Sequence, residues 1–244
     1  MELNFSFPKE LARVKDEKIP IVLCGGTVEY HGAHCSFGCD SLIAEGLIKK
    51  LSEKKELMIY PTVYYSPSSY AVADETSGTV HIEEDVFEAY LFGIFKNMLY
   101  AGLRNIYVVI HHQFESESLM PMTLSYMKAA KRATMRYLEE TLGKGWWGSE
   151  SFSDYYENLG GGDDPFSWIK VIPTMSTEVQ KATGYDHAGK YECSILMALY
   201  PDAVKKERLG DVKHWFAESA KDASFELGQE MVEKSLSWLN EKIK

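Results

Sequence analysis

A run of sixteen residues near the start of the chain, GGTVEYHGAHCSFGCD, concentrates side chains that bind metals or transfer protons. Glu29 and His31 are two residues apart, so in an extended segment both side chains project to the same side. Asp40 follows nine residues later, and two intervening glycines permit a tight reversal that would return it to the other two. Two carboxylates and one imidazole suit zinc, manganese or iron, and a shared carboxylate can bridge two ions. The segment therefore predicts a metal site.

Two later segments carry side chains of the same kinds. His111 and His112 end an otherwise apolar strand, where a buried imidazole needs a polar partner, and Glu115 follows within reach. Because side chains alternate along a strand, we expect only one of the two histidines to face a pocket at the strand end. His187 and Glu192 lie five residues apart where a loop leads into a helix. Glu192 falls in the first turn, where the helix dipole favours its charge.

Each residue of the first segment also has a purely structural interpretation. Asp40 can cap the helix that follows it, Glu29 can be a surface carboxylate, and His31 can be a packed core ring. When Glu29, His31 and Asp40 are considered alone, the structural and the metal-binding interpretations both stay open.

The cysteines give little support to a thiolate metal site. Cys35 and Cys39 have no second pair at zinc-finger spacing, so we interpret them as small packing residues. His34 is expected to support the loop or to line the pocket. The sequence also lacks a G-x-S-x-G elbow and a G-x-G-x-x-G phosphate loop, which leaves a serine nucleophile or a bound nucleotide with little support.

Short apolar segments rich in β-branched residues alternate with longer amphipathic ones. This pattern predicts an α/β fold with a mostly parallel sheet and helices on its faces. The expected strands are 19–25, 57–65, 105–112 and 168–174. The expected helices are 41–54, 84–102, 116–142, 190–199 and 213–242. Ligands of such sheets bind outside the carboxyl ends of the strands, which is where the polar segments are expected to lie.

Residues 143–167 are rich in glycine, aromatic and acidic residues and show neither helical nor strand periodicity. Loops of this length are often lids or binding segments. The aromatic side chains would either cover the pocket as a lid or bury a subunit interface, and we favour the interface. Because no repeat, linker or charge block divides the chain, we expect a single domain over residues 1–244.

The composition excludes several classes of partner. A hydrophobic content of 45% in 244 residues supports a sizeable buried core. A formal net charge of −10, without a dense basic stripe, argues against nucleic acid or an anionic membrane surface as a partner. No apolar run is long enough to span a bilayer, and the first residues lack a signal pattern, so we expect a cytoplasmic protein with reduced thiols.

Together, these motifs resemble the creatininase (creatinine amidohydrolase) family of metal-dependent hydrolases, which have an α/β/α sandwich fold and commonly form hexamers. The opening segment resembles the family motif GSxEQHGPHLPLxTD. HAGKYECSILMALYPDAV at 187–204 resembles HAGxxETSLMLALYPDLV, and SGTVHI at 77–82 resembles PGTxSL. The similarity runs in order through most of residues 20–204. It implies a three-layer α/β/α sandwich with a mostly parallel central sheet.

The resemblance also implies a binuclear centre with two divalent metal ions per chain, zinc or manganese, with iron as a further option. The residues that match the family's ligands are Glu29, His31, Asp40, His112 and Glu192. Asp40 is the implied bridge between the ions. His187 matches the histidine that creatinine-hydrolysing members use for proton transfer.

The chain departs from the family at pocket positions. The family segment NGHGGN reads IHHQFE here, and the glutamate that creatinine-hydrolysing members carry two residues after the histidine is replaced by Phe114. Glu115 is the nearest candidate for that second catalytic group. Tyr30 stands where the family has glutamine, and Tyr185 stands where it has tryptophan. With His111, these two tyrosines are expected to bind the substrate.

The expected function is metal-assisted hydrolysis of a small cyclic amide or a related amide, with His187 and Glu115 as catalytic residues. One alternative is hydrolytic ring opening of a cyclic ketone or diketone of the inositol-degradation type on the same metal centre. Another is a metal-binding family member without catalytic activity. The expected partners are a small-molecule substrate and further copies of the chain, a hexamer by resemblance.

Overall fold

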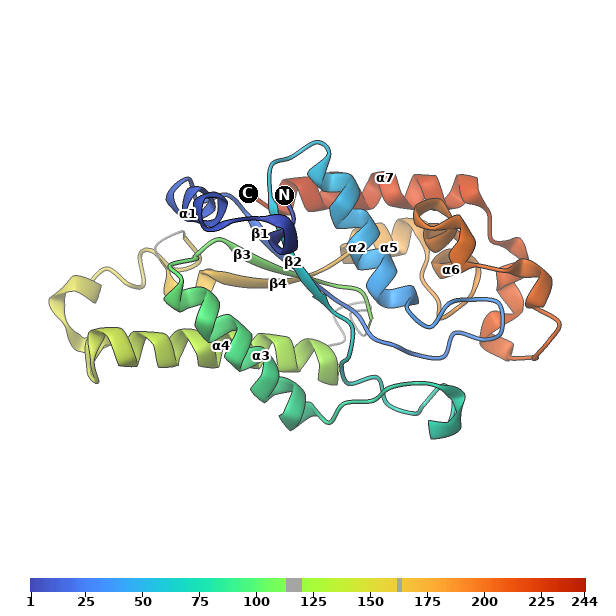
Figure 1. Cartoon of the computed structure of the whole chain (residues 1–244), viewed down its shortest axis with the longest axis horizontal. Coiled ribbons are helices and arrows are strands. Elements are labelled where there is room, and N and C mark those ends of the chain that lie inside the picture. Colours follow the sequence, from blue (N-terminus) through green and yellow to red (C-terminus); the bar gives the residue numbers. More distant parts are fainter. Residues whose placement is uncertain (113–119, 162–163) are drawn as a thin grey trace.

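A parallel sheet forms the centre of the molecule (Figure 1). The computed structural model describes residues 1–112, 120–161 and 164–244. Within them the sheet has four strands in the order β2-β1-β3-β4, and every pair of neighbours is parallel. The strands are β1 (Ile21–Gly25), β2 (Met58–Val63), β3 (Ile106–Ile110) and β4 (Ile169–Pro173). Helices lie on both faces, which confirms the expected α/β/α sandwich.

The helices of the described residues form the two outer layers. The α-helices are α1 (Pro8–Asp16), α2 (Cys39–Ser52), α3 (Glu84–Tyr100), α4 (Pro121–Leu142), α5 (Thr177–Thr183), α6 (Lys190–Leu199) and α7 (Phe225–Lys242). The 3-10 helices are η1 (Leu3–Phe5), η2 (Glu75–Ser77), η3 (Trp146–Gly148), η4 (Glu150–Phe152), η5 (Pro165–Ser167), η6 (Pro201–Ala203), η7 (Lys206–Arg208) and η8 (Trp215–Asp222). Over the same residues, no helix has both the length and the apolar character needed to cross a bilayer.

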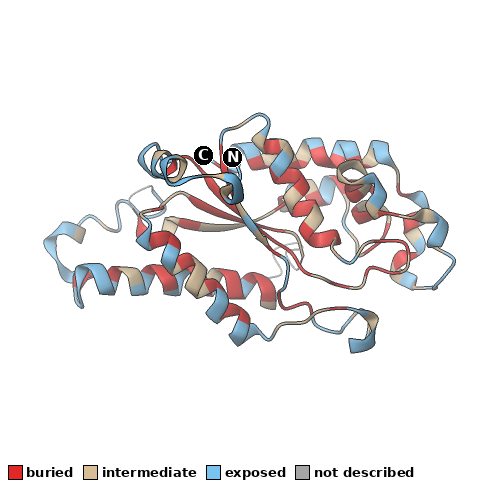
Figure 2. Cartoon of the chain, viewed as in Figure 1, coloured by how far each residue is buried: buried red, intermediate tan, exposed pale blue. Residues whose placement is uncertain are grey.

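Alternate residues of the strands supply the two halves of the core. Val22 and Cys24 of β1 pack with buried residues of α2, α6 and α7. Ile21 and Leu23 of the same strand pack with buried residues of α3 and α4 on the other face. Strands covered on both faces are continuous apolar runs, which is why these segments could be recognised in the sequence. Figure 2 shows the strands β1 and β3 and the inward faces of the helices as buried.

One expectation about the helices needs correction, and two α-helices of the structure were not expected. The helix expected at 213–242 is two helices, η8 and α7, because the Ser224 hydroxyl accepts the N–H of Leu227 at 3.2 Å and caps a new helix there. Neither α1 nor α5 was expected, although Pro8 at the first turn of α1 and the Ser176 cap of α5 are typical start signals. For the helix expected at 116–142, the described part begins at Pro121, and residues 116–119 lie outside the described residues.

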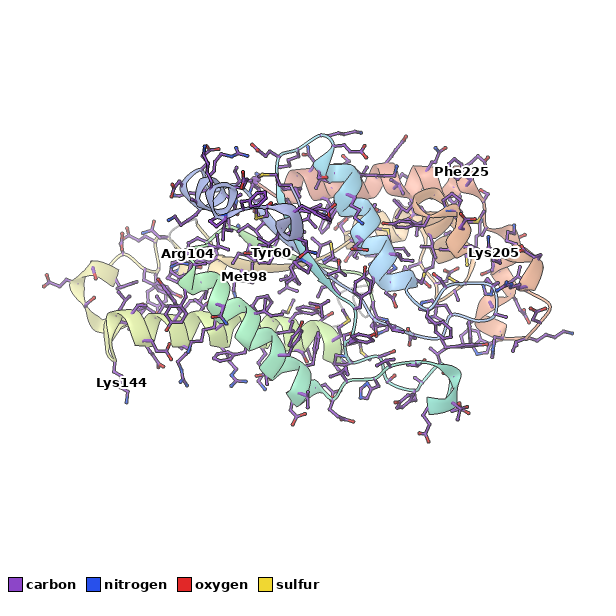
Figure 3. The ribbon with its side chains drawn as sticks, viewed as in Figure 1. Tyr60, Met98, Arg104, Lys144, Lys205 and Phe225 are labelled. Carbon is purple, nitrogen blue, oxygen red and sulfur yellow. The ribbon has the colours of Figure 1, made fainter. Side chains whose placement is uncertain are left out.

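The aromatic segment 143–167 lies at the amino-terminal edge of the sheet. Helix α4 runs from the carboxyl end of β3 back to the start of β4, so its far end, at Leu142, lies away from the carboxyl ends of the strands (Figure 1). In Figure 3, Lys144 marks this end of the molecule and Lys205 the other. The described residues of this segment, 143–161 and 164–167, therefore do not cover the carboxyl edge within one chain, and for them the lid interpretation is wrong in a single chain. The subunit-interface interpretation stays a prediction.

Candidate metal centre

The loop that follows β1 brings a carboxylate and an imidazole to the carboxyl edge of the sheet. The N–H of Glu29 donates to the carbonyl of Phe37 at 3.0 Å, which closes the loop on itself. His31 Nδ1 donates to the backbone oxygen of Glu29 at 3.0 Å, and this bond leaves Nε2 as the nitrogen that faces the site. Both side chains are buried. The surface interpretation of Glu29 is therefore wrong.

Asp40 lies between two sets of potential ligands. It is buried in the first turn of α2, where Gly38 and not Asp40 is the N-cap residue, so the capping interpretation is wrong. Asp40 Oδ2 lies 3.8 Å from His31 Nε2 on one side and 3.6 Å from His112 Nδ1 on the other. A single carboxylate oxygen is thus close to imidazoles from two different segments.

Both histidines at the end of β3 face the same pocket, so the expectation that only one would do so is wrong. The strand ends at Ile110, and His112 adopts a φ of 105°, which breaks the alternation of side chains. His112 Nδ1 lies 3.4 Å from Glu29 Oε2. His111 Nε2 lies 3.2 Å from Glu192 Oε1.

The start of α6 holds Glu192 in place with backbone groups. The N–H of Ala188 donates to Glu192 Oε2 at 2.7 Å, and the same oxygen lies 3.4 Å from His31 Nε2. Asp186 accepts the N–H groups of Tyr191 and Glu192, each at 3.0 Å, and so orders the first turn of the helix. As expected, Glu192 is therefore in the first turn and buried in the site.

His187 covers the site from the same loop. Its ring stacks on His31 with 4.3 Å between the ring centroids. Its Nε2 donates to the backbone oxygen of Tyr30 at 3.2 Å, and its Nδ1 lies 3.8 Å from Glu29 Oε2. The His187 side chain keeps 27% of its surface exposed, so the ring connects the buried groups with solvent.

The electrostatics of the site favour neutral imidazoles at His31 and His112 and an ionised carboxylate at Glu192. Burial lowers the pKa of His31 to about 4 and that of His112 to about 3, so both rings keep a free lone pair at neutral pH. Burial alone would raise the pKa of Glu192, but its electrostatic interaction with His31 and its contact with His111 outweigh burial and lower that pKa. Neutral imidazoles and carboxylates are the forms in which these groups bind divalent cations.

The donor atoms fall into overlapping groups with spacings that fit a coordinated ion. Glu29, Asp40 and His112 form one group, and Asp40, His111 and Glu192 form another, each with donor atoms within 4.8 Å of one another. Zinc bound tetrahedrally at about 2.1 Å places its ligands about 3.4 Å apart. The pairwise contacts described above run from 3.2 to 3.8 Å, so the residues present fit divalent ions.

The thiols near the site remain packing groups. Cys39 Sγ lies in a group with His31 and Glu192, but burial raises the pKa of this thiol well above its ordinary value, which disfavours the thiolate that binds metals. Cys35 and Cys39 are both free and buried. His34 Nε2 donates to the backbone oxygen of Ala188 at 2.8 Å and so connects the loop after β1 with the loop before α6. This contact agrees with the expectation that His34 supports the loop.

A cavity of about 310 Å³ opens over these residues. Its polar lining comes from Asp40, His111, His112, Thr174, Gln180, Tyr185, Asp186, His187 and Glu192. Tyr185 lies at its rim and is 46% exposed. Tyr30 is not part of the lining, because its hydroxyl bonds His214 Nε2 at 3.1 Å, and its role in substrate binding stays a prediction. Glu115 lies outside the described residues.

Sequence reasoning missed several polar residues in or beside the site. Thr174 directly follows β4 at the carboxyl edge of the sheet, and its position at a strand end was an available signal. Asp186 precedes the start of α6 by a few residues, as capping carboxylates do. His214 reaches Tyr30 across 184 positions of sequence, and nothing in the local pattern pointed to that contact.

Comparisons with known proteins identify the family and the fold. The family described as "Creatininase: Creatinine amidohydrolase" matches residues 7–242. The creatinine amidohydrolase of Pseudomonas putida is 21% identical over 203 residues, covering 82% of this chain and 72% of that protein. The structure "Creatininase Mn" has a TM-score of 0.71 at 18% identity, covering 99% of this chain and 98% of its own. A mutant creatininase of the Zn-Zn type has the same TM-score at 19% identity and the same coverage. The match over almost all of its length shows that the chain belongs to the creatininase family.

Proposed function

We propose that this chain is a binuclear metal-dependent hydrolase that acts on a small cyclic amide or a related amide. The position of Asp40 supports the proposal most directly. Its Oδ2 lies within 4 Å of both His31 Nε2 and His112 Nδ1, in the place that a bridging carboxylate would occupy. Family membership supports the hydrolase activity independently.

The proposed metal ligands are Glu29, His31, Asp40, His112 and Glu192. Their nitrogen and carboxylate donors suit zinc or manganese, and iron is compatible with the same set. Related structures are described as a manganese creatininase and as a Zn-Zn type. We propose two ions per chain because two donor groups share Asp40.

Two divalent ions at this site would supply an activated water with a pKa lowered towards neutrality and would polarise the carbonyl that it attacks. The chain's own contribution is proton transfer. His187 is held by its bond to the Tyr30 backbone oxygen, so that Nδ1 is directed towards the Glu29 carboxylate. Because the ring also reaches solvent, it can exchange a proton there and deliver it to the leaving group. We propose Glu115 as its catalytic helper.

The cavity limits the substrate to a small molecule. Its volume of about 310 Å³ is at the lower end of the range for small-molecule sites. Tyr185 at the rim and Gln180 in the lining offer groups that can bind a polar ring. We propose Tyr30 and Tyr185 as substrate-binding residues, with Tyr30 acting from the edge of the site.

The test is turnover of a panel of cyclic and linear amides by metal-loaded and chelator-treated protein, read as release of ammonia or amine. We expect turnover only with metal. His187→Asn should lose about 10²–10⁴ in rate while it keeps its ions, because it removes acid–base help and no proposed ligand. His81→Asn is the matched control, since His81 accepts the N–H groups of Ser68 and Ser69 and is not among the proposed ligands.

Full activity in the metal-free protein would contradict the proposal. Conversion of a cyclic ketone to an open-chain acid, without release of an amine, would favour the ring-opening alternative. Two bound ions with no turnover across the panel would favour a metal-binding protein without catalysis.

A further inference from the structure

His111 makes polar contacts through both ring nitrogens. Nδ1 lies 2.9 Å from the hydroxyl of Thr174, and Nε2 lies 3.2 Å from Glu192 Oε1. Only 13% of the His111 side chain is exposed. A ring nitrogen of His111 that could bind a metal also lies within 4.8 Å of a carboxylate oxygen of Asp40. The contact with Thr174 therefore fixes one side of the ring, and the other side faces the carboxylates of Glu192 and Asp40.

We propose that His111 is itself a metal ligand, through Nε2, at the ion held by His31, Asp40 and Glu192. This inference rests on the proposed function, because it assigns a further ligand to the same centre. It moves His111 from the substrate-binding residues, where the sequence placed it, to the metal-binding residues.

The contact with Thr174 allows the ring to serve as a ligand. Thr174 is buried, and its own N–H donates to the backbone oxygen of Ile110 at 2.9 Å, which fixes the hydroxyl beside the ring. A hydroxyl either donates or accepts, so it can accept the Nδ1–H of His111. Nε2 then carries a lone pair that faces a carboxylate oxygen at 3.2 Å. Two acceptors at that distance repel each other unless a cation lies between them, and a hydrogen bond at the other nitrogen is the usual support of a ligating histidine.

The number of donors then distinguishes the two ions. With His111, one ion has four protein donors, which are His31, Asp40, Glu192 and His111. The other ion has three, which are Glu29, Asp40 and His112. Zinc sites with four protein donors are closed, whereas sites with three keep a position for water. The water-binding role would then fall to an ion held by Glu29, Asp40 and His112.

The test counts imidazole ligands in the cobalt-loaded protein by proton NMR. Each histidine bound to Co²⁺ contributes one strongly shifted, solvent-exchangeable ring N–H signal. We expect at least three signals in the wild type, from His31, His111 and His112. His111→Asn and His111→Gln should each show one signal fewer, and the control His81→Asn should show none fewer. Competition with a chelator should show a loss of about 10–100-fold in the affinity of one ion in both variants.

The two variants separate a ligand from a residue that only positions Glu192. Asn reproduces the contact of Nδ1 with Thr174 but does not reach Glu192, whereas Gln reaches the place of Nε2 and can donate a hydrogen bond to the carboxylate. If Gln restores the wild-type affinity, His111 positions Glu192 and the proposal is wrong. Fewer than three signals in wild-type protein with two bound ions would also overturn it, without the need for any variant. A wild type that binds no Co²⁺ would overturn the proposed function as well.

Discussion

Acidification of the metal-free protein should weaken the fold in a window set by a buried histidine. Burial lowers the pKa of His31 from 6.5 to about 4. The unfolded chain therefore takes up a proton at His31 below pH 6.5, whereas the folded chain does so only near pH 4. Because the unfolded state binds more protons in between, the free energy of unfolding decreases as the pH falls through that window. From these two pKa values, the loss at pH 4 is about 3 kcal/mol.

The loss is large compared with the ~5–15 kcal/mol that stabilises a typical domain. Since the pKa of His112 is also lowered, to about 3, this residue adds a loss of the same sign. The assay is urea unfolding between pH 7 and pH 4 in the presence of a chelator. His31→Asn should flatten the pH dependence, whatever its effect on stability at pH 7, because it removes the titrating ring. Equal pH slopes for the wild type and His31→Asn would refute the reasoning.

Three further predictions concern packing and assembly. Gly228→Ala should lower the free energy of chemical unfolding by about 1–3 kcal/mol or more, because the new Cβ would lie 1.9 Å from the backbone oxygen of Ser194, where α7 meets α6. The control Gly93→Ala, with no atom near its new Cβ, should leave that free energy equal or higher. The four free cysteines are all buried, so they should react with a thiol reagent only on unfolding, and rapid reaction of the native protein would contradict the described core. Light scattering should give the mass of a homo-oligomer, and the mass of a single chain would refute that expectation.

Much of the framework could be predicted because it depends on local pattern. The strands β1 and β3 are continuous apolar runs, which are typical of strands buried on both faces. In a parallel sheet, the residues after such strands meet at one edge, so Glu29 and His112 could be placed in one site from the sequence pattern. Glu192 lies in α6, and its place among the ligands came from the resemblance of its segment to the family motif. The structure brings these three segments together with contacts of 3.2 to 3.6 Å.

The orientation of individual side chains could not be predicted, because it depends on backbone angles and distant contacts. The positive φ of His112 directs it to the same pocket as His111, and nothing in the pattern IHH signals that angle. Asp40 lies inside the helix rather than at its cap because α2 begins at Cys39, two residues earlier than its sequence indicates. The bond between His111 and Thr174 joins residues 63 positions apart, beyond the reach of any local pattern.

The central claim is that two divalent ions share Asp40, and metal analysis of the purified protein tests it most directly. We predict two ions per chain in the wild type and the loss of both in Asp40→Ala, because each donor group depends on that carboxylate. Asp202→Ala, which removes a fully exposed aspartate, should keep both ions. A wild type without metal after loading, or an Asp40→Ala variant that retains two ions, would contradict the account.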